Sequence, residues 1–383
     1  MRIAKYAFSI CAVAAVASAA GLDTYVQTNL VSDIPGMART LDPNLKNPWG
    51  IVAGPTSPFW INDNKTGLST LYNGSGNIIP LVVTVPAPAG SSGPSAPTGI
   101  VFTGTMPAFG GNAFIFDTED GTISAWKPAD GTTAVLQGPG GAAGSVYKGL
   151  AVGTSSAGAV LYATNFGLGR IDVFNSKFQH TTLSGSFTDP NLPKGYAPFN
   201  IQNIGDRLYV TYALQDSDHK DDVAGPGHGF VDVFDLNGHM LRRVVSQSAL
   251  NSPWGLALAP GDFGKFSNDL LVGNFGNGWI NAFNPRTGAF IGSLDGTDGS
   301  PIVIQGLWGL DFGNGAQGQL KDALYFTAGI PGSGAVEDHG LYGSLLATPE
   351  PQSAFLIGLA GISMIAFSLA QRNGAKASRK RIL

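Results

Sequence analysis

Short runs of alternating apolar and polar residues fill most of the chain, and one recurring phrase sets their order. In three copies the phrase is a Pro, an aromatic or small residue and a Gly, the other three vary one or two of these positions, and each copy leads directly into an apolar run. It stands at residues 48–51, 97–100, 147–150, 198–201, 253–256 and 307–310. Neighbouring copies are therefore 49 to 55 residues apart. A repeat of this length indicates six copies of one supersecondary unit.

Each copy continues with further runs of strand character. A second apolar run follows, as at Phe114-Ile115-Phe116, and a third run alternates between apolar and polar residues, as at residues 230–234. Turn residues such as Ala129-Asp130-Gly131 then precede a fourth strand. No amphipathic helical pattern interrupts residues 22–348. Four short antiparallel strands at this period are typical of a propeller blade.

The pattern therefore predicts an all-β fold, a six-bladed β-propeller of four-stranded antiparallel blades over residues 21–347. The sixth copy ends near Leu346 with only three strands, whereas a spare strand stands at residues 24–30. We predict that this N-terminal strand completes the sixth blade, because closing the ring leaves no open sheet edge. The Gly of the phrase is expected where the innermost strands crowd around the central channel.

Both ends of the chain predict export. Residues 1–20 have a positive start, an apolar stretch and small residues at their end, as in a signal peptide. Residues 348–383 form a tail with Pro349-Glu350-Pro351, an uncharged stretch at 353–370 and a basic end at 371–383. The uncharged stretch is just long enough for a transmembrane helix, and the basic end should stay in the cytoplasm. Cys11, the one cysteine, lies in the predicted leader, so the exported domain would be stabilised by packing alone.

Removal of both ends leaves an acidic domain. Without the two basic residues of the leader and the five of the tail, 15 Lys and Arg face 26 Asp and Glu, a net charge near −11. Such a domain is not expected to bind nucleic acid or an anionic membrane surface. The charge is compatible with divalent cations and with neutral glycans.

Oxygen-bearing side chains follow the second strand of most repeats. If the equivalent loops converge on one mouth of the channel, they form a ring that could hold Ca²⁺ or another divalent metal. The alternative is that each side chain ties its own turn by hydrogen bonds to the backbone. The metal candidates of this ring are Asp63, Asp117, Asn165 and Asn274, with Tyr212 and Ala328 at the other two positions.

An inserted acidic loop at residues 215–229 of the fourth repeat, and a smaller counterpart at 337–339, offer a second candidate site. If both project from one face, they could form a metal site. Their spacing matches neither an EF-hand nor a zinc signature, and a solvated acidic loop is the alternative. The candidate ligands are Asp218, Asp221, Asp222, His228, Asp338 and His339.

Trp49, Trp254 and Trp308 occupy the same position of the repeat. Exposed at the channel mouth they could stack on sugar rings, and buried they would pack between blades. No nucleophile elbow, zinc-protease helix, P-loop or dinucleotide fingerprint is found in the sequence.

The repeats resemble those of the NHL/SMP-30-like six-bladed propellers. The opening Asn47-Pro48-Trp49-Gly50-Ile51, its echo at residues 251–256 and the ending at 338–343 look more closely like an uncharacterised family of exported bacterial propellers. In SMP-30-like lactonases a metal at the channel mouth is held by Glu, Asn and Asp. The Glu residues of this chain, Glu119, Glu337 and Glu350, fall outside the repeat pattern.

The tail resembles the PEP-CTERM sorting signal. This resemblance implies cleavage near Pro349, Glu350 and Pro351 by an exosortase-type enzyme, after signal peptidase has removed the leader. It also implies a domain held outside the inner membrane by the tail helix and then sorted to the cell surface or released. An ordinary C-terminal membrane anchor is the alternative.

Three functions are consistent with these features. The first is a binding or scaffold module of the cell envelope or extracellular matrix, with a glycan such as exopolysaccharide or an envelope protein as partner. The lack of a recognisable catalytic set favours it. The second is a metal-dependent, lactonase-like hydrolase or lyase with its site at the channel mouth. The third is a passive spacer.

Overall fold

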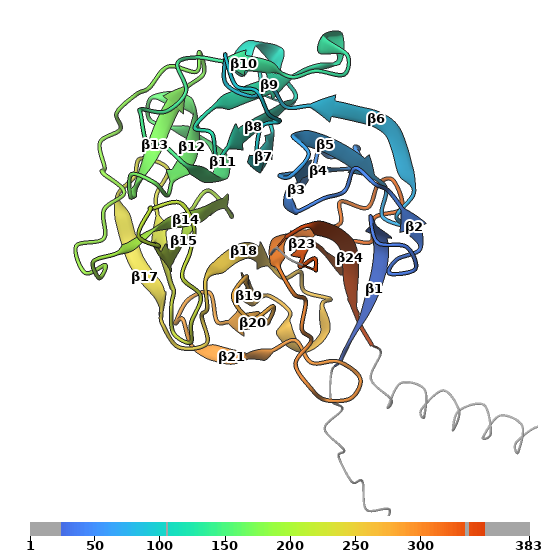
Figure 1. Cartoon of the computed structure of the whole chain (residues 1–383). Helices are drawn as coiled ribbons and strands as arrows, with labels where there is room; N and C mark the ends of the chain where they lie inside the picture. Colours follow the sequence, from blue (N-terminus) through green and yellow to red (C-terminus); the bar gives the residue numbers. More distant parts are fainter. Residues whose placement is uncertain (1–23, 105, 334–336, 349–383) are drawn as a thin grey trace, which may run out of the picture. The chain divides into compact units, whose positions relative to one another are not determined.

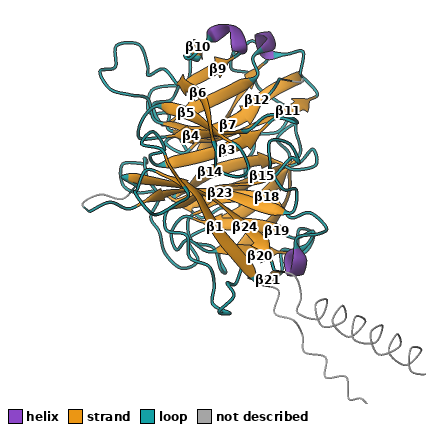
Figure 2. Ribbon diagram, turned by 90° about the vertical axis from the view of Figure 1, so that its right-hand side faces the viewer, coloured by secondary structure: helices purple, strands orange, loops and turns teal. Residues whose placement is uncertain are grey.

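The computed structural model describes residues 24–104, 106–333 and 337–348. These residues form six antiparallel sheets arranged in a ring, and the innermost strand of each sheet faces a common axis (Figure 1). The predicted six-bladed β-propeller is confirmed. Viewed from the side, the ring is built from strands and loops, with helix confined to short turns such as Pro128–Asp130 (Figure 2).

Each of the six repeats forms one blade, and the recurring phrase opens its innermost strand. Blade 1 comprises β3 (Pro48–Ala53), β4 (Phe59–Asp63), β5 (Leu68–Tyr72) and β6 (Ile78–Thr84). Blade 2 comprises β7 (Pro97–Phe102), β8 (Phe114–Thr118), β9 (Ile123–Trp126) and β10 (Val135–Gln137), and blade 3 comprises β11 (Tyr147–Ser155), β12 (Gly158–Asn165) and β13 (Arg170–Asn175). Blade 4 comprises β14 (Tyr196–Asn203), β15 (Leu208–Leu214), β16 (Phe230–Phe234) and β17 (Met240–Ser246). Blade 5 comprises β18 (Pro253–Leu258), β19 (Leu270–Asn274), β20 (Ile280–Phe283) and β21 (Phe290–Ser293), and blade 6 comprises β22 (Leu307–Phe312), β23 (Ala323–Ile330), β24 (His339–Ala347) and β1 (Tyr25–Ser32).

The N-terminal strand closes the ring as predicted. β1 pairs antiparallel with β24, from Tyr25 opposite Ala347 to Ser32 opposite Leu341. A short parallel strand, β2 (Thr40–Leu41), adds a fifth strand outside it. The last blade therefore combines strands from both ends of the ring, and its outer edge is covered.

Blade 3 departs from the predicted four strands. β13 is its outermost strand, and only an isolated bridge between Phe174 and His180 marks the position of a fourth. The segment that follows carries Pro190 and Pro193 and lacks the alternation of a strand. Past His180 the chain turns to blade 4, where the N–H groups of Gly185 and Phe187 donate to the carbonyl O atoms of Asn237 and Gly238, so these groups do not extend a ladder with β13.

The hydrophobic core lies between neighbouring blades. Trp60 and Leu71 of blade 1 pack with Ile100, Phe114 and Trp126 of blade 2, and similar clusters fill the other interfaces. Period-2 alternation explains this arrangement, since each strand presents one row of apolar side chains to each adjacent blade.

The Gly of the phrase lies where two innermost strands approach most closely. A Cβ added to Gly50 would lie 2.4 Å from the carbonyl O of Thr98 in the next blade, and one added to Gly99 would lie 2.4 Å from the backbone N of Leu150. The predicted close approach is confirmed. In blade 4, Asn200 takes this position and donates from its Nδ2 to the carbonyl O of Trp254, at 2.7 Å.

The predicted signal peptide at residues 1–20 and the predicted tail helix at 353–370 lie outside the described residues. Within the described part of the chain, no helix is long and apolar enough to cross a membrane.

Candidate functional site at the channel mouth

The second residue of the phrase points to the axis in every blade. At the end of the channel where the innermost strands begin, hereafter the channel mouth, these residues form a ring. All six are buried, and in chain order they are Trp49, Thr98, Lys148, Phe199, Trp254 and Trp308.

Four aromatic members of this ring, Trp49, Phe199, Trp254 and Trp308, pack against one another and form what we call the aromatic plug. The rings of Trp49 and Trp308 stack with their centroids 3.5 Å apart. Trp254 meets both edge-on, at 6.0 and 5.8 Å. The three tryptophans therefore pack against one another, which is the alternative to sugar stacking. Below the plug, the innermost strands of all six blades line a cavity of about 20 Å³, room for about one water molecule.

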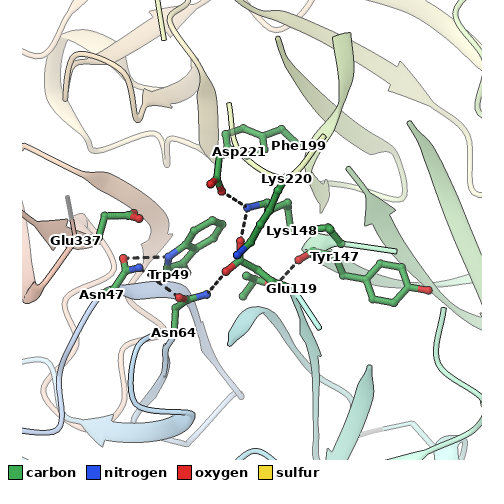
Figure 3. A network of polar contacts seen from close by, with 12 residues as sticks. Asn47, Trp49, Asn64, Glu119, Tyr147, Lys148, Phe199, Lys220, Asp221 and Glu337 are labelled. Carbon is green, nitrogen blue, oxygen red and sulfur yellow. Dashed lines mark hydrogen bonds and ion pairs between the residues drawn. The ribbon is translucent and has the colours of Figure 1, made fainter. Parts of the chain in front are cut away.

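Lys148 is the charged member of the ring, and its side chain is only 1% exposed. Its Nζ lies 4.9 Å from the Trp49 ring centroid, a cation–π contact. It also pairs with Glu119 and lies 3.4 Å from Oδ1 of Asp221 (Figure 3). Burial lowers the pKa of Lys148, but the two carboxylates outweigh that effect and hold the pKa above its ordinary value. Lys148 is therefore a fixed cation.

Glu119 connects this cation to the plug through two asparagines (Figure 3). Its Oε2 accepts from Nδ2 of Asn64 at 3.1 Å, and Oδ1 of Asn64 accepts from Nδ2 of Asn47 at 3.4 Å. Oδ1 of Asn47 in turn accepts from Nε1 of Trp49 at 3.0 Å. Burial raises the pKa of Glu119, but Lys148 outweighs it and the net shift is downward. Glu119 is thus ionised at neutral pH.

Glu337 also lies at the mouth, and its pKa shifts in the opposite direction to that of Glu119. Its Oε1 accepts a hydrogen bond from Nε1 of Trp308 at 2.7 Å. Burial raises the pKa of Glu337 to about 7, with a further contribution from the charge of Glu119. Two carboxyl groups around one lysine therefore differ in protonation near neutral pH.

The inserted loop at residues 215–229 reaches this mouth with Asp221 and Asp222. Asp221 is the exposed partner of Lys148, with 66% of its side chain accessible. Burial raises the pKa of Asp222, and the neighbouring Ser252 and Lys148 offset only part of that effect. Although Ser252 lies beside Asp222, neither Oγ of Ser252 nor Oδ2 of Asp222 has a partner at hydrogen-bonding geometry.

Three residues of the mouth have a left-handed backbone conformation. Asn47 and Ser252 both have φ of 48° and both precede a proline, and Glu337 has φ of 67°. Left-handed φ is uncommon for residues other than Gly, and the left-handed conformation is unfavourable before proline. The same conformation is found elsewhere in the described ring, for example at Phe109 and Gln317, so it is not specific to the mouth.

The predicted oxygen ring is not aligned as expected. Pro48 pairs with Asp63, but Pro97 pairs with Thr118, so the blade 2 equivalent of Asp63 is Thr118. Asp117 is instead equivalent to Asn62 of blade 1. Its side chain therefore points to the opposite face of the sheet from that of Thr118. This corrects the predicted ring, in which Asp117 was aligned with Asp63. The strand register shows that the aligned residue is the next one, Thr118.

The four metal candidates of that ring have partners within the blades. Oδ1 of Asn165 accepts from the N–H groups of Val146 and Leu168, and Oδ1 of Asn274 accepts from the N–H of Asn251. For Asn165 the turn-tying alternative is observed, whereas Asn274 bonds the segment that precedes β18 and not its own turn. Asp63 accepts from Oγ1 of Thr70, and Asp117 accepts from Oγ1 of Thr98 and from the N–H of Gly99.

The six candidates of the acidic loops are likewise distributed over several places. Asp221 and Asp222 lie at the mouth, and Asp218 is exposed on the loop. Nδ1 of His228 lies 2.8 Å from the carbonyl O of Val223. Asp338 pairs with Lys65, and Nδ1 of His339 lies 2.8 Å from Oδ2 of Asp33. Among all the described residues, no group of three or more His, Asp or Glu side chains is arranged to hold a metal ion.

Sequence reasoning assigned no ligand role to five residues of the mouth, namely Asn47, Asn64, Glu119, Lys148 and Glu337, although Glu337 begins the acidic segment at 337–339. One signal was available for Lys148, because a charged residue stands in the phrase where the other repeats have Trp, Phe or Thr. Nothing in the repeat pattern marks Glu119 or Glu337, which lie on connecting loops.

Fold and site define a six-bladed β-propeller with a lysine-centred acidic mouth. The chain belongs to the same family as two proteins of Acanthamoeba polyphaga mimivirus, both described as uncharacterized. Protein R648 is 36% identical over 297 residues, 73% of this chain and 72% of the relative. Protein L690 is 34% identical over 304 residues, 75% of this chain and 78% of the relative. No family model matches the chain.

Solved structures share the fold at low sequence identity. A protein of unknown function from Bacteroides thetaiotaomicron has a TM-score of 0.50 at 13% identity, over 84% of this chain and 76% of that chain. A streptogramin B lyase has a TM-score of 0.48 at 12% identity, over 85% of this chain and 97% of that chain. Neither likeness bears on activity.

Proposed function

We propose that this protein is an exported propeller that binds a glycan or protein partner at the channel mouth. The observation that carries the proposal is the Lys148 network, a buried ion pair joined to the aromatic plug and covered by an inserted acidic loop. The export part of the proposal rests on the sequence of residues 1–20 and 348–383.

The chemistry of the mouth suits recognition. Lys148 stays protonated, so its amine lacks the free lone pair that a nucleophile needs. The plug blocks the axis, so a partner meets the mouth from one side only. Asn64, Asp221 and Asp222 offer amide and carboxylate groups there, and such groups hydrogen-bond to hydroxyls and to N–H donors. A network held by its own ion pairs is preorganised, which reduces the entropic cost of binding.

Binding can be tested by presenting the protein to a glycan array and to envelope extracts, with Asp221→Asn as the test variant. Asp221 is exposed, so this change should leave folding intact while it weakens capture. Asp262→Asn is the matched control, because Asp262 is exposed on the loop after β18, at the other end of the channel. We expect the control to bind as the unmodified protein does. Equal capture by all three proteins, or turnover of a lactone or glycan that depends on Glu337, would refute the proposal.

A further inference from the structure

We infer that the channel mouth is a binding site for a primary ammonium group, and that the side chain of Lys220 takes this place in the structure. The inference rests on the proposed binding role of the mouth and specifies the chemistry of its ligand. It arises from three independent features of the mouth.

The first feature is an excess of acidic groups. Glu119, Asp221, Asp222 and Glu337 all interact electrostatically with Lys148, which is the single buried ammonium among them in the described chain. Lys148 already pairs with Glu119 and Asp221. Asp222 and Glu337 therefore lack a cation of their own, and a second cation would be attracted.

The second feature is a pair of unused acceptors. Ser252 is fully buried, and its Oγ makes no hydrogen bond of regular geometry, although its hydroxyl interacts with the Asp222 carboxyl beside it. Oδ2 of Asp222 makes no such bond either. A buried polar atom without a partner costs free energy, so a ligand that donates to both would recover that cost. An ammonium group has three donors and no acceptor, which suits a hydroxyl and carboxylates together.

The third feature is the position of Lys220. This residue is exposed on the inserted loop, yet its side chain runs into the mouth toward Glu119 (Figure 3). Its charge contributes to the lowered pKa of Glu119. The chain thus places one of its own ammonium groups among the carboxylates, and the exposed loop allows that group to be exchanged for an external one.

A compact ammonium fits this mouth better than a divalent metal does. Ca²⁺ needs six to eight oxygen ligands at close range. Over the described residues, no three acidic or His side chains converge in that way.

The test is isothermal titration of the full chain with three probes and with CaCl₂. The probes are a glucosamine oligosaccharide with free amines, its N-acetylated counterpart, and Nα-acetyl-lysine amide. We expect the two amines to bind and the N-acetylated sugar to fail. The amine that binds with the higher affinity shows whether the natural ligand is an amino sugar or a lysine side chain. Binding should also release protons, since a cation at the mouth lowers the pKa of Glu337.

Two variants make the test specific. Lys220→Ala removes the internal competitor and should raise amine affinity about tenfold, whereas Lys177→Ala, an exposed lysine of blade 3, should leave it unchanged. Asp222→Asn should lower amine affinity at least about tenfold. If neither amine binds the unmodified protein or the Lys220→Ala variant, or if the N-acetylated sugar or Ca²⁺ binds in their place, the inference is wrong. The proposed function would survive that result if Asp221→Asn still weakened capture of a partner.

Discussion

Lys148 shows how one residue can turn a packing position into a site. The equivalent residues of the other blades fill the axis with apolar or small side chains, whereas Lys148 brings a charge into the same layer. Removing an ammonium from water costs several kcal/mol unless it is paired and hydrogen-bonded. Glu119 provides that compensation, and the two asparagines fix the position of Glu119.

Breaking this pair should be costly. In Lys148→Met the Glu119 carboxylate remains buried without its cation, so we expect a loss of about 3–5 kcal/mol in the free energy of unfolding. Chemical denaturation measures the loss. The double variant Lys148→Met with Glu119→Gln should regain a large part of it, because the buried side chain at position 119 then carries no charge that lacks its cation. A double variant less stable than Lys148→Met would contradict this account of the network.

At the scale of elements, polar side chains of the second strands join one blade to the next. Nδ2 of Asn62 donates to the carbonyl O of Thr98 at 3.3 Å, and Oγ1 of Thr164 donates to that of Phe199 at 3.2 Å. Oγ1 of Thr327 in blade 6 donates to the carbonyl O of Trp49 in blade 1 at 2.5 Å. These bonds satisfy buried carbonyl groups of the channel ring, and they set the spacing that the Gly of each phrase permits.

The spacing between innermost strands gives a second prediction. Gly50→Ala would place a Cβ 2.4 Å from the Thr98 carbonyl, so the strands must separate. We expect a loss of about 1–3 kcal/mol, typical of overpacking. Gly93→Ala is the control, because a Cβ there meets nothing within 4 Å, and it should change stability by less than about 0.5 kcal/mol. Equal stability of the two variants in denaturant titration would show that the strands can separate freely.

Closure by β1 gives a third prediction. Deletion of residues 24–32 exposes the edge of β24 and removes the buried side chains of Leu30 and Val31 from the core. We expect a lower melting temperature, a broader transition and aggregation, since an open edge strand pairs with other chains. Removal of the exposed residues 91–93 is the control and should leave melting nearly unchanged. A truncated chain that melts as sharply as the control would mean that the ring holds without this strand.

At the scale of the whole molecule, buried carboxyl groups set the pH dependence of stability. Burial raises the pKa values of Asp117 and Asp232 to about 7, and that of Glu337 also to about 7. These groups bind protons more tightly in the folded state than in the unfolded chain. Their contribution to stability is complete below about pH 4 and is lost as the pH rises through about 7.

The protein should therefore melt at a lower temperature at pH 8 than at pH 5. Asp117→Asn should reduce this difference, because an amide can still accept the bonds from Thr98 and Gly99 but cannot ionise. Differential scanning calorimetry across this range measures both effects. Asp262→Asn, on an exposed loop, should keep the full pH dependence. A melting temperature that rises with pH, or one that Asp117→Asn leaves unaltered, would contradict the prediction.

The fold followed from local pattern because a propeller repeats one unit. The phrase opens every innermost strand, and the missing strand of the sixth repeat was recognised by counting. The phrase recurs about every 50 residues and is a local signal, whereas closure was inferred by comparing the strand count at the two ends of the ring. The pattern failed at blade 3, where a segment of strand-like position lacks strand composition, and at Asp117, where a difference of one residue reverses the side chain's facing.

The site depended on contacts that the pattern does not contain. Repeat comparison could place Trp49, Trp254 and Trp308 at one position, but only the closed ring brings residues from different blades together as one plug. Glu119 and Glu337 lie more than 200 residues apart on irregular loops, and both reach the mouth because the ring returns to its start. The period of the pattern specifies which side chains of a strand point to each face of its sheet. Charged residues of different blades meet across the axis only because the ring is closed. The propeller could therefore be predicted from the chain alone, and the lysine-centred mouth came from its tertiary structure.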